Sequence, residues 1–395
     1  MILKEKISEV MKQSISNSEV MGVNLLVEKD GREIIYCEEG MADRENHKPI
    51  HRDTIFRLYS QTKPVTAACA MILMERGLLD PGTSVAEYLP AYADLKVESP
   101  QGICPAQIPV RIHDLLRMTS GLVYPDDCTE SGRAVDRLYQ EACDRLHTDN
   151  PVTTRELADR LAGCPLAFEP GCGWRYGTSA DVLGAVIEVI SGEKLSEFMQ
   201  EEIFEPLGMK DTAFWVPKEK QYRLAKAYET VWDKDGNRSM KLYTGDNLAI
   251  RNDMAEPPAY EAGGAGLVST LDDYMKFARM LRQNGSLGEK QILKPETVHY
   301  MCNAQLLPVQ QRDMDKWLGL EGYSYGNLMR VCKNPSQAVM MARKGEYGWD
   351  GWLGMYFANF PDEGMTILMG TQKKDAGTFA LTRKLRNVIL SECLK

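Results

Sequence analysis

The sequence lacks the features that usually bind metals or nucleic acids. Its ten cysteines are scattered singly, with no C-x-x-C pair of the kind that metal sites and redox motifs use. The formal net charge of -9 is unfavourable for binding phosphate backbones, and no run rich in lysine and arginine offers a local exception. We therefore expect no metal, no cofactor and no nucleic-acid partner.

Long apolar segments are also missing. The first fifteen residues carry charges at positions 4, 5, 6, 9 and 12, which interrupt the apolar core that a secretory signal requires. No window is long and apolar enough to span a bilayer, and neither an internal repeat nor a low-complexity linker is present. Because the cysteines are interpreted as reduced thiols, the prediction is a cytoplasmic protein without a membrane span.

What is present suits a large globular enzyme, since 395 residues with 44% hydrophobic content can form a substantial core. An amphipathic helix is predicted at the N-terminus, because apolar residues recur there at helical spacing: Leu3, Ile7, Val10, Met11 and Ile15. Strand-like stretches flank Asp30-Gly31, a pair typical of a hairpin turn, and two more, 355–360 and 365–371, flank a Pro-Asp-Glu-Gly turn. The final stretch, 378–394, is predicted to be a helix. Both ends of the chain thus contribute strands and helices.

Between these ends the apolar periodicity is mostly helical. Helices are predicted over 64–77, 111–118, 154–163, 179–191, 195–205 and 271–284. This order predicts a discontinuous α/β domain, 1–65 and 260–395, interrupted by a mostly helical domain, 66–259. The active site is expected between the two.

Candidate chemistry begins at Ser60-Gln61-Thr62-Lys63, which opens a helical run after a short apolar stretch. A spacing of three residues puts Ser60 and Lys63 on the same helical face. A serine hydroxyl is a poor nucleophile near neutral pH, and a desolvated lysine can accept its proton. A helix N-terminus also offers a free backbone N–H and the positive end of the helix dipole to an oxyanion.

Two other serines match short catalytic patterns but lack the required setting. Ser191-x-x-Lys194 lies at a helix exit, where a C-cap and a solvated lysine are the simpler interpretation. Ser324 lies in a G-x-S-x-G pattern, yet all five histidines precede it, whereas the nucleophile elbow of α/β-hydrolases is followed by its histidine. Ser60 is therefore the predicted nucleophile.

The segment from Ser60 to Lys63 resembles the first motif of class C β-lactamases, D-alanyl-D-alanine carboxypeptidases and family VIII carboxylesterases. Further segments resemble the same family in the same order: 112–122 (IHDLLRMTSGL), 168–171 (FEPG) followed by Trp174 and Tyr176, and 264–270 (GAGLVST). The resemblance covers most of the chain. It implies a β-lactamase/transpeptidase-like α/β fold, in which helices flank an antiparallel sheet and a mostly helical domain is inserted.

The resemblance also implies roles for individual residues. Ser60 would be the nucleophile, Lys63 and Tyr176 would share proton transfer, and the backbone N–H groups of Ser60 and Trp352 would form the oxyanion hole. An adjacent lysine ammonium would favour the ionised form of Tyr176. The family's Tyr-x-Asn is replaced by Tyr176-Gly177-Thr178, so Thr178 is expected to take part in substrate binding and to support the site with a hydroxyl instead of an amide. His113 lies in a family segment, but a structural role is favoured for it.

The late motif differs from that of β-lactamases. Where β-lactamases and carboxypeptidases have Lys-Thr-Gly, this chain has Trp349-Asp350-Gly351, similar to the esterase branch, and these three residues are predicted to contact substrate. A cation that would neutralise a substrate carboxylate is therefore missing, unless Arg330, Arg343 or Lys344 replaces it.

The predicted function that follows is a serine esterase acting on a small acyl substrate. β-Lactamase, carboxypeptidase, acyltransferase or a non-catalytic penicillin-binding sensor remain as alternatives. Neither the natural substrate nor the oligomeric state follows from the sequence.

Overall fold

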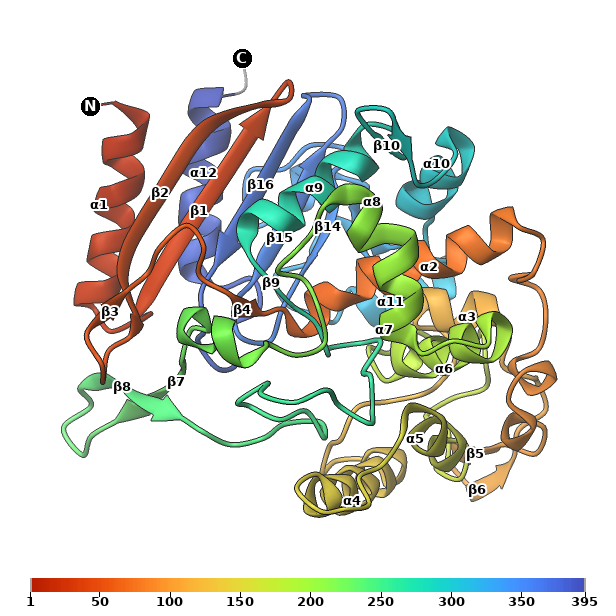
Figure 1. The fold of residues 1–395 in the computed structure, drawn as a ribbon. Helices are drawn as coiled ribbons and strands as arrows, with labels where there is room; N and C mark the ends of the chain where they lie inside the picture. The colour runs from red at the N-terminus through yellow and green to blue at the C-terminus, as the bar shows by residue number, and fades with distance from the viewer. Residues whose placement is uncertain (1, 394–395) are drawn as a thin grey trace.

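A computed structural model describes residues 2–393, and its centre is an eight-stranded antiparallel sheet (Figure 1). The strand order is β12-β13-β14-β15-β16-β1-β2-β3. The strands are β1 (Gly22–Lys29), β2 (Arg32–Asp43), β3 (Lys48–Pro49), β12 (Tyr323–Tyr325), β13 (Arg330–Cys332), β14 (Tyr347–Asp350), β15 (Tyr356–Phe360) and β16 (Met365–Gly370). The N-terminal hairpin thus pairs with the C-terminal strands through β1 and β16.

Strand alternation gives this sheet two apolar faces. On β1, Leu26 faces the larger hydrophobic core, while Leu25 and Val27 face a smaller one. On β16, Leu368 faces the larger core and Ile367 faces the smaller one. Strands β15 and β16 are buried along their whole length, so helices must cover this part of the sheet on both sides.

The twelve α-helices of the described residues cover these faces or form the inserted region. They are α1 (Leu3–Ser16), α2 (Lys63–Glu75), α3 (Ile112–Arg117), α4 (Glu130–Arg145), α5 (Thr154–Leu161), α6 (Ser179–Ser191), α7 (Leu195–Met199), α8 (Glu205–Leu207), α9 (Leu271–Arg282), α10 (Pro295–Asn303), α11 (Pro308–Met314) and α12 (Ala380–Cys393). Helices α1 and α12 pack together on the face that holds the smaller core, and α9 contacts β15 and β16 (Figure 1).

Short irregular helices connect these elements. One π-helical turn, Gln200–Phe204, joins α7 to α8. The 3-10 turns are Tyr59–Thr62, Val85–Glu87, Pro90–Tyr92, Lys218–Arg223 and Pro335–Gln337. The predicted helix over 195–205 is therefore three consecutive helical segments.

Four small hairpins or strand pairs lie outside the main sheet, and their pairings were not predicted. They are β4 (Phe56–Arg57) with β9 (Val268–Ser269), β5 (Lys96–Ser99) with β6 (Gly102–Pro105), β7 (Ala227–Trp232) with β8 (Arg238–Tyr243), and β10 (Ser286–Leu287) with β11 (Lys290–Gln291). The segment 66–259 thus holds two hairpins besides its helices, and the predicted boundary at residue 65 falls inside α2.

The other predicted helices agree with the structure to within about three residues, and that over 179–191 coincides with α6. Residue 394, the last of the predicted C-terminal helix, lies outside the described residues. Helix α4 was overlooked because seven of its sixteen residues are charged, so its apolar stripe is narrow.

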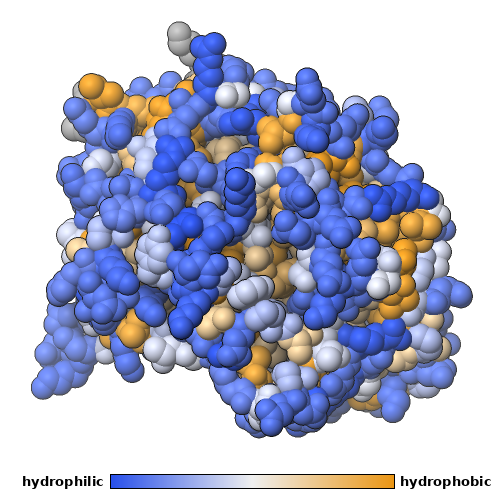
Figure 2. Space-filling model, in the orientation of Figure 1, coloured by the Kyte–Doolittle hydropathy of each residue, from blue (hydrophilic) through white to orange (hydrophobic). Residues whose placement is uncertain are grey.

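The outer surface is mostly hydrophilic, with apolar residues in separate small patches on the face drawn in Figure 2. Within residues 2–393, no helix is both long enough and apolar enough to cross a membrane.

Candidate active site

Ser60 is held at a sharp turn between β4 and α2. The residue before it, Tyr59, has a φ of 46°, a left-handed conformation that is uncommon for a tyrosine. The N–H of Leu58 donates to the carbonyl of Leu267 at 2.8 Å. On the other side, a Cβ added to Gly351 would lie 2.2 Å from the Leu58 carbonyl oxygen, so only glycine fits there. The turn carrying Ser60 is therefore fixed by two segments distant in sequence.

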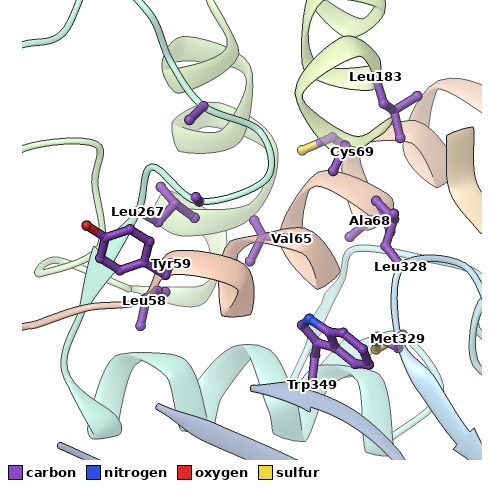
Figure 3. Packing of buried hydrophobic residues seen from close by; sticks show 14 of the residues in the cluster. Leu58, Tyr59, Val65, Ala68, Cys69, Leu183, Leu267, Leu328, Met329 and Trp349 are labelled. Atoms are coloured by element: carbon purple, nitrogen blue, oxygen red, sulfur yellow. The ribbon is translucent and has the colours of Figure 1, made fainter. Parts of the chain in front are cut away.

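The buried packing under this turn is apolar. Figure 3 shows Val65 and Ala68 of α2 among buried side chains, with Trp349 rising from the sheet below the helix. All three have at most 2% of their surface exposed. Helix α2 is thus a rigid base for the side chains on its first turn.

Lys63 lies next to Ser60 and is fully buried. Its Nζ donates to Ser60 Oγ at 3.1 Å, to the Tyr124 hydroxyl at 3.0 Å and to the Gly264 carbonyl at 2.8 Å. Burial lowers the pKa of Lys63 to about 7, against the opposing effect of Asp181. An amine with such a pKa is substantially neutral near pH 7 and can accept a proton from the serine.

Tyr176 borders the same group of atoms. Its hydroxyl accepts a hydrogen bond from Trp349 Nε1 at 2.9 Å, and Lys63 Nζ lies 4.6 Å from its ring centroid. Burial raises the pKa of Tyr176, although the contacts with Ser60 and Trp349 lower it in part. The negative charges of Asp350 and Asp181 raise this pKa further, so its shift is opposite to the one expected from an adjacent lysine ammonium.

Two polar residues near Lys63 were overlooked in the sequence. Tyr124 follows the TSGL motif by two residues, so proximity to that motif was an available signal. Asp181 lies on the first turn of α6, and its Oδ1 accepts from the Tyr260 hydroxyl at 2.7 Å and from the Gly264 N–H at 3.0 Å. Burial raises the pKa of Asp181, and Lys63 lowers it. Gly264 thus links this carboxyl to the lysine through its N–H and its carbonyl.

Next to Ser60 and Tyr176 lies a cavity of about 700 Å³. Ser60, Tyr176, Trp349, Asp350 and Gly351 all line it, so the structure brings these predicted residues together. Its size matches the pockets that hold small organic molecules.

The two remaining predicted site residues differ in their exposure to this cavity. Trp352 lines the cavity, and within residues 2–393 its backbone N–H has no hydrogen-bond acceptor, while its carbonyl accepts from the Ala376 N–H at 3.0 Å. Thr178 is fully buried, is not among the lining residues, and its hydroxyl has no partner in the described chain. Thr178 is therefore placed behind the cavity and not in its wall.

None of the three cations considered as replacements for the missing lysine lines the cavity. Arg330 is 1% exposed and lies over the Tyr356 ring, where its positive charge lowers the pKa of Asp350 against the raising effect of burial. Arg343 pairs with Glu363 at 3.2 Å, and Lys344 borders a different cavity. These side chains cannot directly bind a carboxylate next to Ser60.

The rival motif residues have structural roles. Ser324 lies within β12, is fully buried, and its hydroxyl accepts the Leu306 N–H at 3.0 Å. The Ser191 hydroxyl donates to the Ile187 carbonyl within its own helix, at 2.9 Å. His113 lies on α3 with Nδ1 3.8 Å from the Asp114 carboxylate and does not line the cavity.

The indole of Trp349 provides a testable contact. Trp349→Phe keeps an aromatic ring but removes the N–H that donates to Tyr176, so we expect kcat/KM for an ester to fall by about twofold to tenfold, the usual net worth of one hydrogen bond. Steady-state kinetics measure this. Trp232→Phe, on an exposed tryptophan of β7, is the control, and equal activity in both variants would contradict a role for the Trp349 N–H.

The fold and this site together define a serine acyl hydrolase of the penicillin-recognising type. The family model described as "Beta-lactamase" matches residues 3–390, and the chain belongs to that family. The chain is a serine hydrolase that resembles carboxylesterases: it is 31% identical to esterase EstB from Burkholderia gladioli, over 98% of this chain and 95% of that protein.

Solved structures agree with this assignment. EstCE1, described as a hydrolase with promiscuous acyltransferase activity, superposes with a TM-score of 0.80 at 26% identity, covering 98% of both chains. Simvastatin synthase from Aspergillus terreus superposes over the whole of both chains with a TM-score of 0.79 at 22% identity, which shows a shared fold. The predicted β-lactamase/transpeptidase-like fold is thereby confirmed.

Proposed function

We propose that this enzyme hydrolyses small esters through an acyl-enzyme on Ser60. The observation that carries the proposal is the contact of Ser60 Oγ with Lys63 Nζ at 3.1 Å, at the base of a cavity whose wall, within residues 2–393, contains no lysine or arginine. EstB, named an esterase, supports the reaction type.

In acylation, Ser60 Oγ forms a bond to the ester carbonyl carbon while its proton passes to the neutral amine of Lys63. The ester C–O bond then breaks, and the leaving alkoxide takes a proton from the protonated Tyr176, which recovers one from Lys63. The backbone N–H groups of Ser60 and Trp352 are the proposed donors to the oxyanion.

Deacylation repeats these steps with water. A water molecule attacks the acyl carbon and gives a proton to the neutral amine of Lys63. The bond between the acyl carbon and Ser60 Oγ then breaks, Ser60 Oγ takes the proton back from Lys63, and the carboxylic acid leaves. An alcohol in place of this water would give acyl transfer, and the promiscuous acyltransferase activity ascribed to EstCE1 supports that second activity.

The charges of the residues that line the cavity favour neutral esters over β-lactams as substrates. Asp350 contributes a carboxylate to the same cavity as Ser60, and Arg330 does not line this cavity and has 1% of its surface exposed. Penicillins and cephalosporins would present their own carboxylate to this wall without a cation to bind it.

We therefore expect kcat/KM for a four-carbon p-nitrophenyl ester to exceed that for a chromogenic cephalosporin by about tenfold to more than a hundredfold. Parallel assays with the wild type and Ser60→Ala measure the ratio. A preference for the cephalosporin would contradict the proposal, and stoichiometric labelling without turnover would favour a penicillin-binding sensor.

Because the late motif lacks the lysine of β-lactamases, a lysine introduced at Trp349 would be an obvious test of this preference. That variant would not isolate the effect of the charge. The side chain is 2% exposed and donates to Tyr176, so Trp349→Lys would remove a contact within the site as well as add a charge.

A cytoplasmic location is also proposed, supported by the ten cysteines, all of which are free thiols in the described chain.

A further inference from the structure

Helix α4 forms one wall of the active-site cavity with a single face. Asp136, Tyr139, Gln140, Cys143 and Asp144 line the cavity, and their spacing of i, i+3, i+4, i+7 and i+8 puts them on one side of the helix. Figure 1 shows α4 at the lower edge of the inserted region. Two of the five residues on this face are therefore aspartates.

The two aspartates of α4 are not paired with a cation. Asp136 accepts a hydrogen bond from Gln140, and neither Asp136 nor Asp144 forms an ion pair within residues 2–393. Two more aspartates line the cavity, but Asp246 contacts His147 at 2.7 Å and Asp350 lies near Arg330. No lysine, arginine or histidine is among the lining residues of the described chain. The cavity thus carries negative potential, concentrated along α4.

The same cavity is rich in aromatic surface. Trp317, which is 39% exposed, stacks edge-on against Tyr176 with 5.1 Å between ring centroids, and Trp349 lies 5.3 Å from Tyr176. Aromatic faces attract cations, most strongly where water is partly excluded.

A separate observation concerns the residue that precedes the nucleophile. Tyr59 lines the cavity with 2% of its surface exposed, and its buried hydroxyl has no hydrogen-bond partner in the described chain. A buried polar group of this kind is normally paired, and a bound molecule would supply the missing partner.

From this combination we infer that the preferred substrates are esters that carry an ammonium group, which lies against Asp136 and Asp144 while the ester carbonyl meets Ser60. The inference rests on the proposed esterase function and narrows its substrate class. The carboxylates attract the charge, the aromatic rings accommodate its methyl or methylene groups, and the absence of a cation among the described lining residues leaves the attraction unopposed.

Matched substrate pairs test the inference. Butyrylcholine is compared with its carbon isostere, in which tert-butyl replaces trimethylammonium, so that the pair differs in charge on the alcohol side. A second pair of p-nitrophenyl esters carries the same two groups at the end of the acyl chain. In at least one pair, we expect kcat/KM to favour the cationic ester by about tenfold at low ionic strength. This ratio should decrease as salt is added, because exposed charges are screened.

Variants of α4 assign the effect to its carboxylates. Asp136→Asn combined with Asp144→Asn should bring the ratio of the cationic to the neutral ester close to one. The matched control is Glu130→Gln combined with Glu141→Gln, which changes the charge of the same helix equally at exposed positions outside the cavity. Thermal unfolding of each variant verifies that it is folded.

The outcomes separate this inference from the proposed function. Ratios of one or less in both pairs, with p-nitrophenyl butyrate still turned over, would overturn the inference and leave the esterase proposal intact. An equal loss of preference in both double variants would also overturn it. If no ester is turned over, choline should still slow fluorophosphonate labelling of Ser60 more than its carbon isostere does, and equal protection would overturn the inference in that case.

Discussion

Ser60→Ala should reduce kcat/KM for p-nitrophenyl butyrate by a factor of about 10⁴ or more, because no other serine lines the cavity in the described part of the chain. Removing a serine nucleophile leaves only the contributions of binding and of the oxyanion donors. Steady-state kinetics on the purified protein measure the loss, and substrate affinity should change little.

Covalent labelling provides an independent readout. A fluorophosphonate probe should modify the wild type once, at Ser60, and should leave Ser60→Ala unmodified. The control is Ser324→Ala, which removes the other serine in a hydrolase-like pattern and should be labelled like the wild type provided that it folds. Labelling that persists in Ser60→Ala would show that the nucleophile is elsewhere.

Lys63→Met is the second variant with a large expected effect. It keeps an unbranched side chain of similar length in the buried site but removes the amine that contacts Ser60, Tyr124 and Gly264. We expect kcat/KM to decrease by about 10²-fold to 10⁴-fold, the range in which a positioned general base contributes. Lys63→Arg should be similarly inactive, because an arginine stays charged at every accessible pH.

The pH dependence of the wild type follows from the same group. Lys63 must be neutral to accept the serine proton, and burial lowers its pKa to about 7. The ester kcat/KM should therefore increase with pH and level off above about 7. A profile already flat from pH 5 would exclude Lys63 as the base.

Stability should change with pH through the same residue. Its pKa in the folded protein lies below the ordinary value of 10.5, so between about pH 7 and 10.5 the unfolded chain binds more protons at this site. The contribution of Lys63 to the free energy of unfolding is therefore lowest below pH 7 and rises across that window. Chemical denaturation at several pH values should show this rise in the wild type and less of it in Lys63→Met.

The sequence predicted local features well where one short segment contains the whole signal. The turn at Asp30-Gly31 needs only residues that tolerate positive φ, and both have it. Helix α6 was predicted within its observed bounds because its apolar face and its terminal Gly192 are both local. Helix α4 was not predicted, since most of its residues are polar or charged and its significance depends on the cavity that it borders.

Within the site, helical spacing in the sequence predicted Ser60 and Lys63 as a pair, and the family resemblance added Tyr176, because spacing and ordered motifs are properties of the chain. Only the tertiary structure decides the direction in which the pKa values of these groups shift. Burial depends on the residues that pack around a side chain from distant segments, and here it lowers the pKa of Lys63 and raises that of Tyr176. The same reason explains why Asp136 and Asp144 could be recognised as part of the cavity only after folding had placed α4 beside Ser60.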